Sequence, residues 1–171
     1  KEFLNEYLKD NITIVCAISG GVDSMCLLDI VKNYPVNIIC AHVNHNLREE
    51  SFEEYEFVKN YCNNNNIVFE GTVLDKIDKG NLESEFRNKR YDFFDTVINK
   101  YNAKYLLTAH HGDDLTETIL MRIVRGSSIN GYSGFEKIST RDNYSILRPL
   151  IYLTKDELYE YAEENNIEFR E

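Results

Sequence analysis

Short apolar runs alternate along the chain with longer stretches in which apolar and polar residues mix. The runs are rich in β-branched residues and only a few residues long, which is typical of strands buried on both faces. In the longer stretches the apolar positions recur at helical spacing, which predicts helices. The predicted strands are 12–18, 36–43, 67–74, 104–109 and 145–147, and the predicted helices are 1–10, 25–31, 49–65, 82–101, 113–124 and a last one that begins near Thr154. At the start of this last helix, Thr154 and Glu157 have the spacing of a capping box.

This alternation predicts the fold class. Consecutive β-α-β units are right-handed and build a mostly parallel sheet with helices on both faces. We therefore expect an α/β protein with a doubly wound, Rossmann-like sheet of five strands in a single domain, residues 1–171. Ligands of such sheets bind beyond the carboxyl ends of the strands, where the strand order reverses. Three of these ends, 19–24, 42–45 and 110–114, hold all four histidines and are the expected site.

Composition narrows the class of protein further. With 43% hydrophobic and 28% charged residues, the chain is globular rather than disordered. No apolar run approaches the ~20 residues of a membrane span, so no membrane association is expected. The sequence has no C-x-x-C pair, which argues against a structural zinc site or an iron–sulfur cluster. Reduced thiols buried in the core fit a cytoplasmic protein, and the four cysteines are Cys16, Cys26, Cys40 and Cys62.

The first site element is the glycine turn between the first strand and its helix, Ser19-Gly20-Gly21-Val22-Asp23-Ser24. Two glycines let a ligand approach the backbone, and the N–H groups and dipole of the following helix favour an anion such as phosphate. An ordinary turn capped by Asp23 or Ser24 explains the same pattern. The turn has neither the lysine of a P-loop nor the spacing of a dinucleotide fingerprint, which disfavours both motifs.

Two later segments carry charged side chains at helical spacing. Arg87 and Arg90 share a helix face and suit a phosphate or carboxylate, although ion pairs with Glu83 and Asp95 would explain them equally well.

Asp114 and Glu117 are three residues apart at the start of a helix and face the same way. They form either a capping box or, with Asp113, oxygen ligands for Mg²⁺ or a grip on an amine.

The net charge of −10 opposes binding to nucleic acid unless basic residues gather locally. The candidates for such a cluster are Arg87, Lys89, Arg90, Arg122, Arg125, Arg141 and Arg148.

Several of these segments match known motifs. The glycine turn resembles, at all six positions, the SGGxDS signature of the N-type ATP pyrophosphatases. The segments 42–51, 85–91, 108–118 and 148–150 resemble motifs of the tRNA(Ile)-lysidine synthetases, a branch of that superfamily. The resemblance spans 12–166 and departs from the family pattern at Phe86, Ser128, Tyr132 and Phe135.

The resemblance implies an adenine nucleotide alpha hydrolase-like fold and a reaction. ATP would activate the wobble cytidine of tRNA(Ile) with a CAU anticodon, and L-lysine would then displace AMP from C2 of the base, forming lysidine. It implies that residues 19–24 bind ATP, that Asp23 and Asp113 bind Mg²⁺, and that Asp114 and Glu117 grip lysine. The AMP phosphate or the tRNA would be held by Arg87, Arg90, Arg125 and Arg148, beside His110 in the substrate site. The catalytic set would be Asp23, Arg90, Asp114 and Glu117.

Further tRNA-binding domains are expected beyond Glu171, and the oligomeric state stays open, a homodimer included.

Two alternative functions remain. One is another PP-loop ATP pyrophosphatase, either an amidoligase or a tRNA thiolase. Amidoligases share only the first loop, and a thiolase normally needs paired cysteines. The other is a nucleotide-binding sensor without chemistry, which would leave ATP intact.

Overall fold

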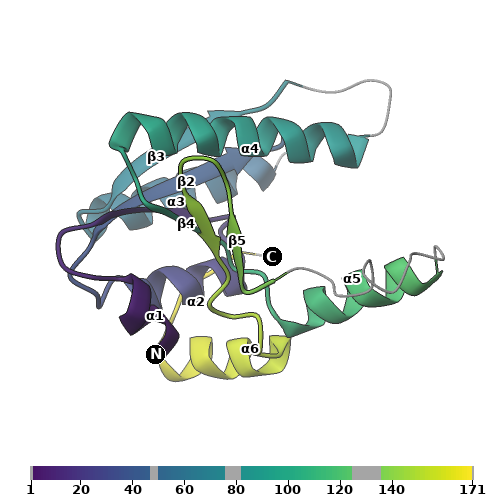
Figure 1. Cartoon of the computed structure of the whole chain (residues 1–171). Coiled ribbons are helices and arrows are strands. Elements are labelled where there is room, and N and C mark those ends of the chain that lie inside the picture. Colours follow the sequence, from purple (N-terminus) through teal and green to yellow (C-terminus); the bar gives the residue numbers. More distant parts are fainter. Residues whose placement is uncertain (1, 47–49, 76–81, 125–135, 171) are drawn as a thin grey trace.

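The computed structural model describes residues 2–46, 50–75, 82–124 and 136–170. A central sheet runs through the molecule with helices on either side (Figure 1). Its strands are β1 (Thr13–Ala17), β2 (Asn37–Asn44), β3 (Val68–Val73), β4 (Tyr105–Leu107), β5 (Ile138–Thr140) and β6 (Ser145–Leu147). The helices are α1 (Glu2–Tyr7), α2 (Val22–Val31), α3 (Glu50–Asn64), α4 (Leu82–Tyr101), α5 (Gly112–Val124) and α6 (Lys155–Glu164).

The strand order is β3-β2-β1-β4-β6-β5, with all neighbours parallel except β5 and β6. The doubly wound, mostly parallel sheet is thus confirmed, but within the described residues it has six strands rather than five. The additional strand is β5, a three-residue edge strand with the sequence Ile-Ser-Thr that turns back against β6. It has no apolar run to reveal it, because only one of its residues is apolar.

Each face of the sheet has its own hydrophobic core. On one face Ile14 and Cys16 of β1 pack with residues of α1, α2, α3 and α6, and on the other Val15 packs against α4. All three side chains are fully buried. This explains why β1 reads as an unbroken apolar run, since both faces of a central parallel strand are covered.

The order of the strands places the site. The chain passes from β1 to β2 and β3 on one side, and then crosses to β4 on the other side of β1. The strand order therefore reverses between β1 and β4, and side chains at the carboxyl ends of these two strands flank the crevice where ligands of such sheets bind.

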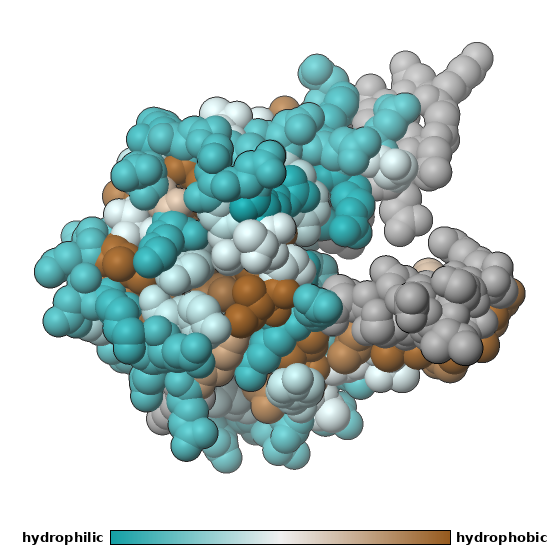
Figure 2. Space-filling view, viewed as in Figure 1, coloured by the Kyte–Doolittle hydropathy of each residue, from teal (hydrophilic) through white to brown (hydrophobic). Residues whose placement is uncertain are grey.

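Two expectations about side chains are confirmed. All four cysteines are buried and free, and Thr154 caps α6 in a capping box with Glu157. In the described part of the chain, no helix is long and apolar enough to cross a membrane. Figure 2 shows apolar side chains along α5, where Leu120, Met121, Ile123 and Val124 are exposed.

Candidate functional site

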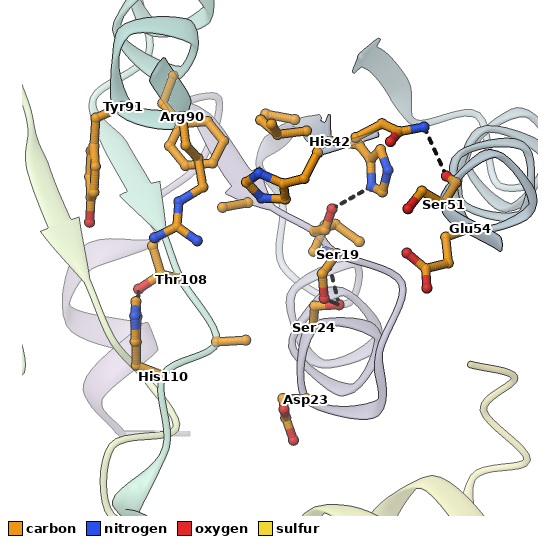
Figure 3. Close-up of a pocket in the computed structure, with 18 of the residues that line it drawn as sticks. Ser19, Asp23, Ser24, His42, Ser51, Glu54, Arg90, Tyr91, Thr108 and His110 are labelled. Carbon is orange, nitrogen blue, oxygen red and sulfur yellow. Dashed lines mark hydrogen bonds between the residues drawn. The ribbon is translucent and has the colours of Figure 1, made fainter. Parts of the chain in front are cut away.

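A cleft of about 430 Å³ opens at the carboxyl ends of β1, β2 and β4 (Figure 3). This volume lies within the range of about 300–1,000 Å³ that is usual for small-molecule sites. Its walls come from the glycine turn, from the ends of β2 and β4, and from α3 and α4. The polar side chains that line it are Ser19, Asp23, Ser24, His42, Asn44, His45, Ser51, Glu54, Arg90, Tyr91, Thr108, His110 and Asp114.

The glycine turn is held from inside by Ser24. Its Oγ accepts hydrogen bonds from the backbone N–H groups of Ser19 (3.2 Å) and Gly20 (3.1 Å) and donates to the carbonyl of Gly21 (3.0 Å). Gly20 has a φ of 100°, which side-chain-bearing residues rarely adopt. Gly21 is the N-cap of α2 and brings no side chain to cap it. The first-turn N–H groups of α2 therefore remain available to an anion.

Asp23, in the first turn of α2, meets two side chains from distant parts of the chain, Lys155 and His111. Both of its carboxylate oxygens accept hydrogen bonds from Nζ of Lys155, at 2.8 Å each. Nε2 of His111 lies 3.7 Å from Oδ2 of Asp23. Sequence reasoning missed Lys155, because the capping box at Thr154 marks only the beginning of a helix and not what the helix faces.

The acids at the start of α5 have structural partners. Oδ2 of Asp114 accepts from the backbone N–H of His111 (2.9 Å), and Oδ2 of Asp113 accepts from that of Lys155 (2.8 Å). His111 is thus the N-cap of α5, and Asp114, three residues later, accepts from the N-cap backbone N–H.

Asp114 lines the cleft, whereas Glu117 does not. Glu117 lies with Asp113, Thr116 and Leu120 along another side of α5. Asp114 and Glu117 thus line different depressions of the surface, and their joint role in holding lysine stays a prediction. The Asp114 side chain bends back toward the beginning of the helix, where its carboxylate accepts from the N–H of His111.

The arginines divide between the cleft and the interior. Arg90 lines the cleft, and Arg87, Arg90 and Arg141 have their guanidinium carbons 5.6, 5.8 and 4.4 Å from the centroid of the Tyr91 ring. Burial lowers the pKa of the Arg90 guanidinium from its usual value. The expected ion pair of Asp95 is made instead with Arg141 at 3.7 Å.

Arg148 is buried and faces the β5–β6 hairpin. Its Nη1 donates to the carbonyl of Glu136 (2.6 Å) and to Oγ of Ser139 (2.7 Å). Arg148 is absent from the lining of the cleft, and these contacts support a structural role, while its contact with a substrate stays a prediction. Arg125 and the loop positions Ser128, Tyr132 and Phe135 lie outside the described residues.

Three of the four histidines are held neutral. Burial lowers the pKa of His42, whose Nδ1 lies 2.8 Å from the carbonyl of Ile18, and burial followed by the charge of Arg90 lowers that of His45. Burial, and secondarily the positive charge of Arg148, lower the pKa of His110 to about 4. In the part of the chain that the structure describes, no group of three or more His, Cys, Asp or Glu side chains is placed to hold a metal ion.

The depressed pKa of His110 predicts a pH dependence of stability. Its folded pKa of about 4 lies below the 6.5 of the unfolded chain. The unfolded state therefore binds more protons between these values, and stability falls as the pH drops through this window. Between pH 7 and pH 5, we expect the free energy of unfolding to fall by about 1–2 kcal/mol less in His110→Gln than in the wild type. Urea unfolding at both pH values measures the difference, and an equal loss in both proteins would contradict the assignment.

Gly112 begins α5 against the segment that precedes α6. Its N–H donates to the carbonyl of Leu153 at 2.7 Å, and a Cβ on Gly112 would lie 2.9 Å from the same oxygen. Because that oxygen belongs to the backbone, we expect Gly112→Ala to lower the free energy of unfolding by about 1–3 kcal/mol. Gly21→Ala is the matched control, since its Cβ meets nothing closer than Ser19 Oγ at 3.6 Å. Urea unfolding of both variants checks this, and equal stability would refute the steric argument.

Glu54 lines the cleft and, after Lys155, is a second residue of the site that the sequence did not reveal. It comes from α3, and its side chain is directed toward the cleft opposite Arg90 (Figure 3). In the sequence it is one of several acids in an amphipathic helix, and nothing in the pattern distinguishes it from its solvated neighbours.

The chain is similar to enzymes of known function. A tRNA(Ile)-lysidine synthase of Staphylococcus aureus (strain COL) is 40% identical over 166 residues, covering 92% of this chain and 38% of the relative. The enzyme of the same name from Bacillus subtilis (strain 168) is 37% identical over 182 residues, covering 99% and 38%. The chain thus spans 38% of the length of both curated relatives.

Among solved structures, the U34-tRNA thiolase NcsA from Methanococcus maripaludis superposes with a TM-score of 0.82 at 19% identity, covering 97% of this chain and 60% of NcsA. The NH3-dependent NAD synthetase of Campylobacter jejuni gives a TM-score of 0.65 at 14% identity, covering 97% and 70%. At such identities these structures show a shared fold. A family model described as the PP-loop domain matches residues 1–171, the whole chain. The glycine turn, the cleft at the strand switch and this match agree, and the chain belongs to the PP-loop domain family.

Proposed function

We propose that this chain is the ATP-using domain of a tRNA(Ile)-lysidine synthetase, a cytoplasmic ligase that joins L-lysine to C2 of the wobble cytidine in tRNA(Ile) with a CAU anticodon. The observation that carries the proposal is the cleft, in which the glycine turn, Arg90 and Asp114 line one cavity. The curated relatives of that name support it, at 37–40% identity over nearly the whole chain.

ATP would bind with its phosphates at the glycine turn and the start of α2, where Gly21 leaves the first-turn N–H groups uncapped. Mg²⁺ fits this edge of the site. It is bound in proteins by one or two carboxylates together with waters and substrate phosphates, and Asp23 already holds a cation, the Lys155 ammonium, between its two oxygens. Asp23 and Asp113 would hold the ion, which would neutralise the charge that develops on the leaving pyrophosphate.

Arg87, Arg90 and Arg141 form a local basic surface around Tyr91, in a chain whose net charge is −10. Such a cluster suits the phosphates of an RNA backbone or the AMP phosphate of an activated nucleotide. A net charge of −10 opposes binding to nucleic acid unless basic residues gather locally. These three arginines do so beside the cleft, which supports binding of RNA there.

Lysine carries a cation that needs an acidic partner. Asp114 lines the cleft and is the residue we propose for that role. Glu117 lies on a different side of α5, so in this arrangement it is the weaker candidate.

The proposed reaction has two displacements. The cytidine O2 attacks the α-phosphorus of ATP, the bond to the β-phosphate breaks, and pyrophosphate leaves. An amine of lysine then attacks C2, AMP leaves with the former O2, and the amine loses a proton. Charge on the first leaving group is stabilised by oriented N–H groups, which is the contribution expected of the glycine turn.

A tRNA thiolase is the competing function, since NcsA shares the fold. The NcsA structure contains a [4Fe-4S] cluster. The four cysteines of this chain are all buried and free, and burial raises the pKa of Cys16 to about 12. Cys16 is thus a poor nucleophile, and no two of the four cysteines form a C-x-x-C pair, which favours ligation over thiolation.

The test is release of pyrophosphate from ATP by the full-length protein that contains this chain. We expect release that requires tRNA(Ile) with a CAU anticodon, and loss of AMP from the tRNA when lysine is added. The matched control is tRNA(Ile) with a GAU anticodon, which lacks the wobble cytidine. Release without tRNA, or equal release with both tRNAs, would refute the proposed function.

A further inference from the structure

Lys155 joins the two acids proposed for Mg²⁺. Its Nζ donates to both carboxylate oxygens of Asp23 at 2.8 Å, and its backbone N–H donates to Oδ2 of Asp113 at 2.8 Å. The Lys155 side chain is 36% exposed and that of Asp23 24% exposed. The ion pair is therefore open enough for solvent or a ligand to compete for it.

The backbone of Lys155 is held by contacts that do not involve its side chain. Thr154 caps α6 in a complete capping box, and the preceding Leu153 accepts from the N–H of Gly112 at 2.7 Å. The ammonium sits at the end of a four-carbon stem that can rotate, with Nζ 5.4 Å from the centroid of the Tyr159 ring. Movement of this ammonium requires no movement of α6.

A divalent cation and a two-oxygen ammonium contact cannot share one carboxylate. If Asp23 is to bind Mg²⁺, at least one of its oxygens must leave Lys155. The displaced ammonium stays anchored at the first turn of α6, next to the start of α2 where the phosphates of ATP would bind.

We propose that Lys155 is a counterion switch of the ATP site: it neutralises Asp23 in the free protein, is displaced when Mg²⁺ arrives with the nucleotide, and then binds the oxygens of the departing pyrophosphate. The inference rests on the proposed function and adds a cationic group that sequence motifs did not identify. In the free protein the pair keeps Asp23 from standing as a lone charge. In the complex the same ammonium stabilises the negative charge of the leaving group.

Two effects of opposite sign follow from this role. Without nucleotide, Lys155 competes with the metal ion, so its removal strengthens metal binding. With nucleotide, Lys155 contacts phosphate, so its removal weakens nucleotide binding. A residue that only holds the fold together would weaken both when replaced.

The experiment measures both affinities in the Lys155→Met variant, which keeps the length of the stem and removes the charge. Free Mn²⁺, followed by electron paramagnetic resonance without nucleotide, should bind about two- to fivefold more tightly than to the wild type, because a part-exposed ion pair is a weak competitor. An ATP analogue with a methylene group between the α- and β-phosphorus atoms, titrated by calorimetry in saturating Mg²⁺, should bind about tenfold more weakly, as expected for a lost charge-assisted hydrogen bond.

Two further variants control the result. Lys59→Met removes the same charge from the exposed Lys59–Glu56 pair on α3 and should leave both affinities unchanged. Lys155→Arg keeps the cation and should retain most of the affinity for the analogue. Circular dichroism and urea unfolding establish that each variant is folded.

The results distinguish failure of the proposed Lys155 switch from failure of the proposed ATP site. Mn²⁺ binding that is unchanged or weaker in Lys155→Met would overturn the switch, as would unchanged affinity for the analogue. In either case the ATP site itself would stand, because the wild type would still bind the analogue. Failure of the wild type to bind the analogue would overturn the switch and the proposed function together.

Discussion

Asp23→Asn should reduce ATP-dependent pyrophosphate release by the full-length protein about 100-fold or more. The substitution keeps the shape of the side chain but removes the charge that would hold Mg²⁺ beside the phosphates, and losses of this size are usual when one stabiliser of transition-state charge is removed. The amide oxygen can still accept from Lys155, so the contact between α2 and α6 is weakened and not abolished. A coupled assay for pyrophosphate at saturating tRNA and ATP measures the change.

Asp29→Asn is the matched control for this prediction. It makes the same chemical change on the same helix, where Asp29 accepts from the hydroxyl of Tyr161 at 2.9 Å and does not line the cleft. We expect it to lower stability while leaving turnover per folded molecule within about twofold. If Asp23→Asn were as active as Asp29→Asn, Asp23 would have no part in the metal site.

Asp114→Asn should raise the KM for lysine by about 100-fold while tRNA-dependent pyrophosphate release without lysine persists. The lost charge is the proposed partner of the lysine cation, and a charge-assisted contact of about 2–3 kcal/mol accounts for such a factor. The asparagine oxygen can still accept from the N–H of His111, so the cap of α5 survives. Steady-state kinetics with varied lysine, at saturating tRNA and ATP, measure the KM.

Asp114→Ala separates the cap from the charge. It removes both, so it should share the kinetic defect and in addition lower the free energy of unfolding by about 1 kcal/mol. Glu117→Gln should change the KM far less, because Glu117 does not line the cleft. A normal KM in Asp114→Asn together with a raised KM in Glu117→Gln would reverse the assignment of the two acids.

Much of the fold could be predicted because the relevant signals are local. Ile14, Val15 and Cys16 are buried on both faces of β1, and a strand in that position must be apolar throughout. The capping box at Thr154 involves residues three apart and was visible in the sequence. The strand β5 was missed because an edge strand of three residues needs no apolar pattern.

The site was predicted only in part, because neighbouring side chains in a helix can serve different partners. Asp114 and Glu117 share a spacing that usually places them together, but the carboxylate of Asp114 turns back to the N–H of His111. Arg148 is basic and follows a strand, as a substrate contact would, yet its guanidinium holds the β5–β6 hairpin. Residue type and spacing do not distinguish a structural contact from a substrate contact, because either one gives the charged side chain a partner.

The alternation of strands and helices can be predicted from the sequence alone, because it depends on residues close together in the chain. The same holds for the glycine turn and for the motifs that indicate an ATP-using enzyme. Which of these segments meet depends on the folding of the whole chain. Lys155 reaches Asp23 across 132 residues, and it does so because the crossover to β4 brings the ends of β1 and β4 together and α6 packs beside α2. Local periodicity carries no information about the order of strands, so a contact that depends on that order appears only when the chain is folded.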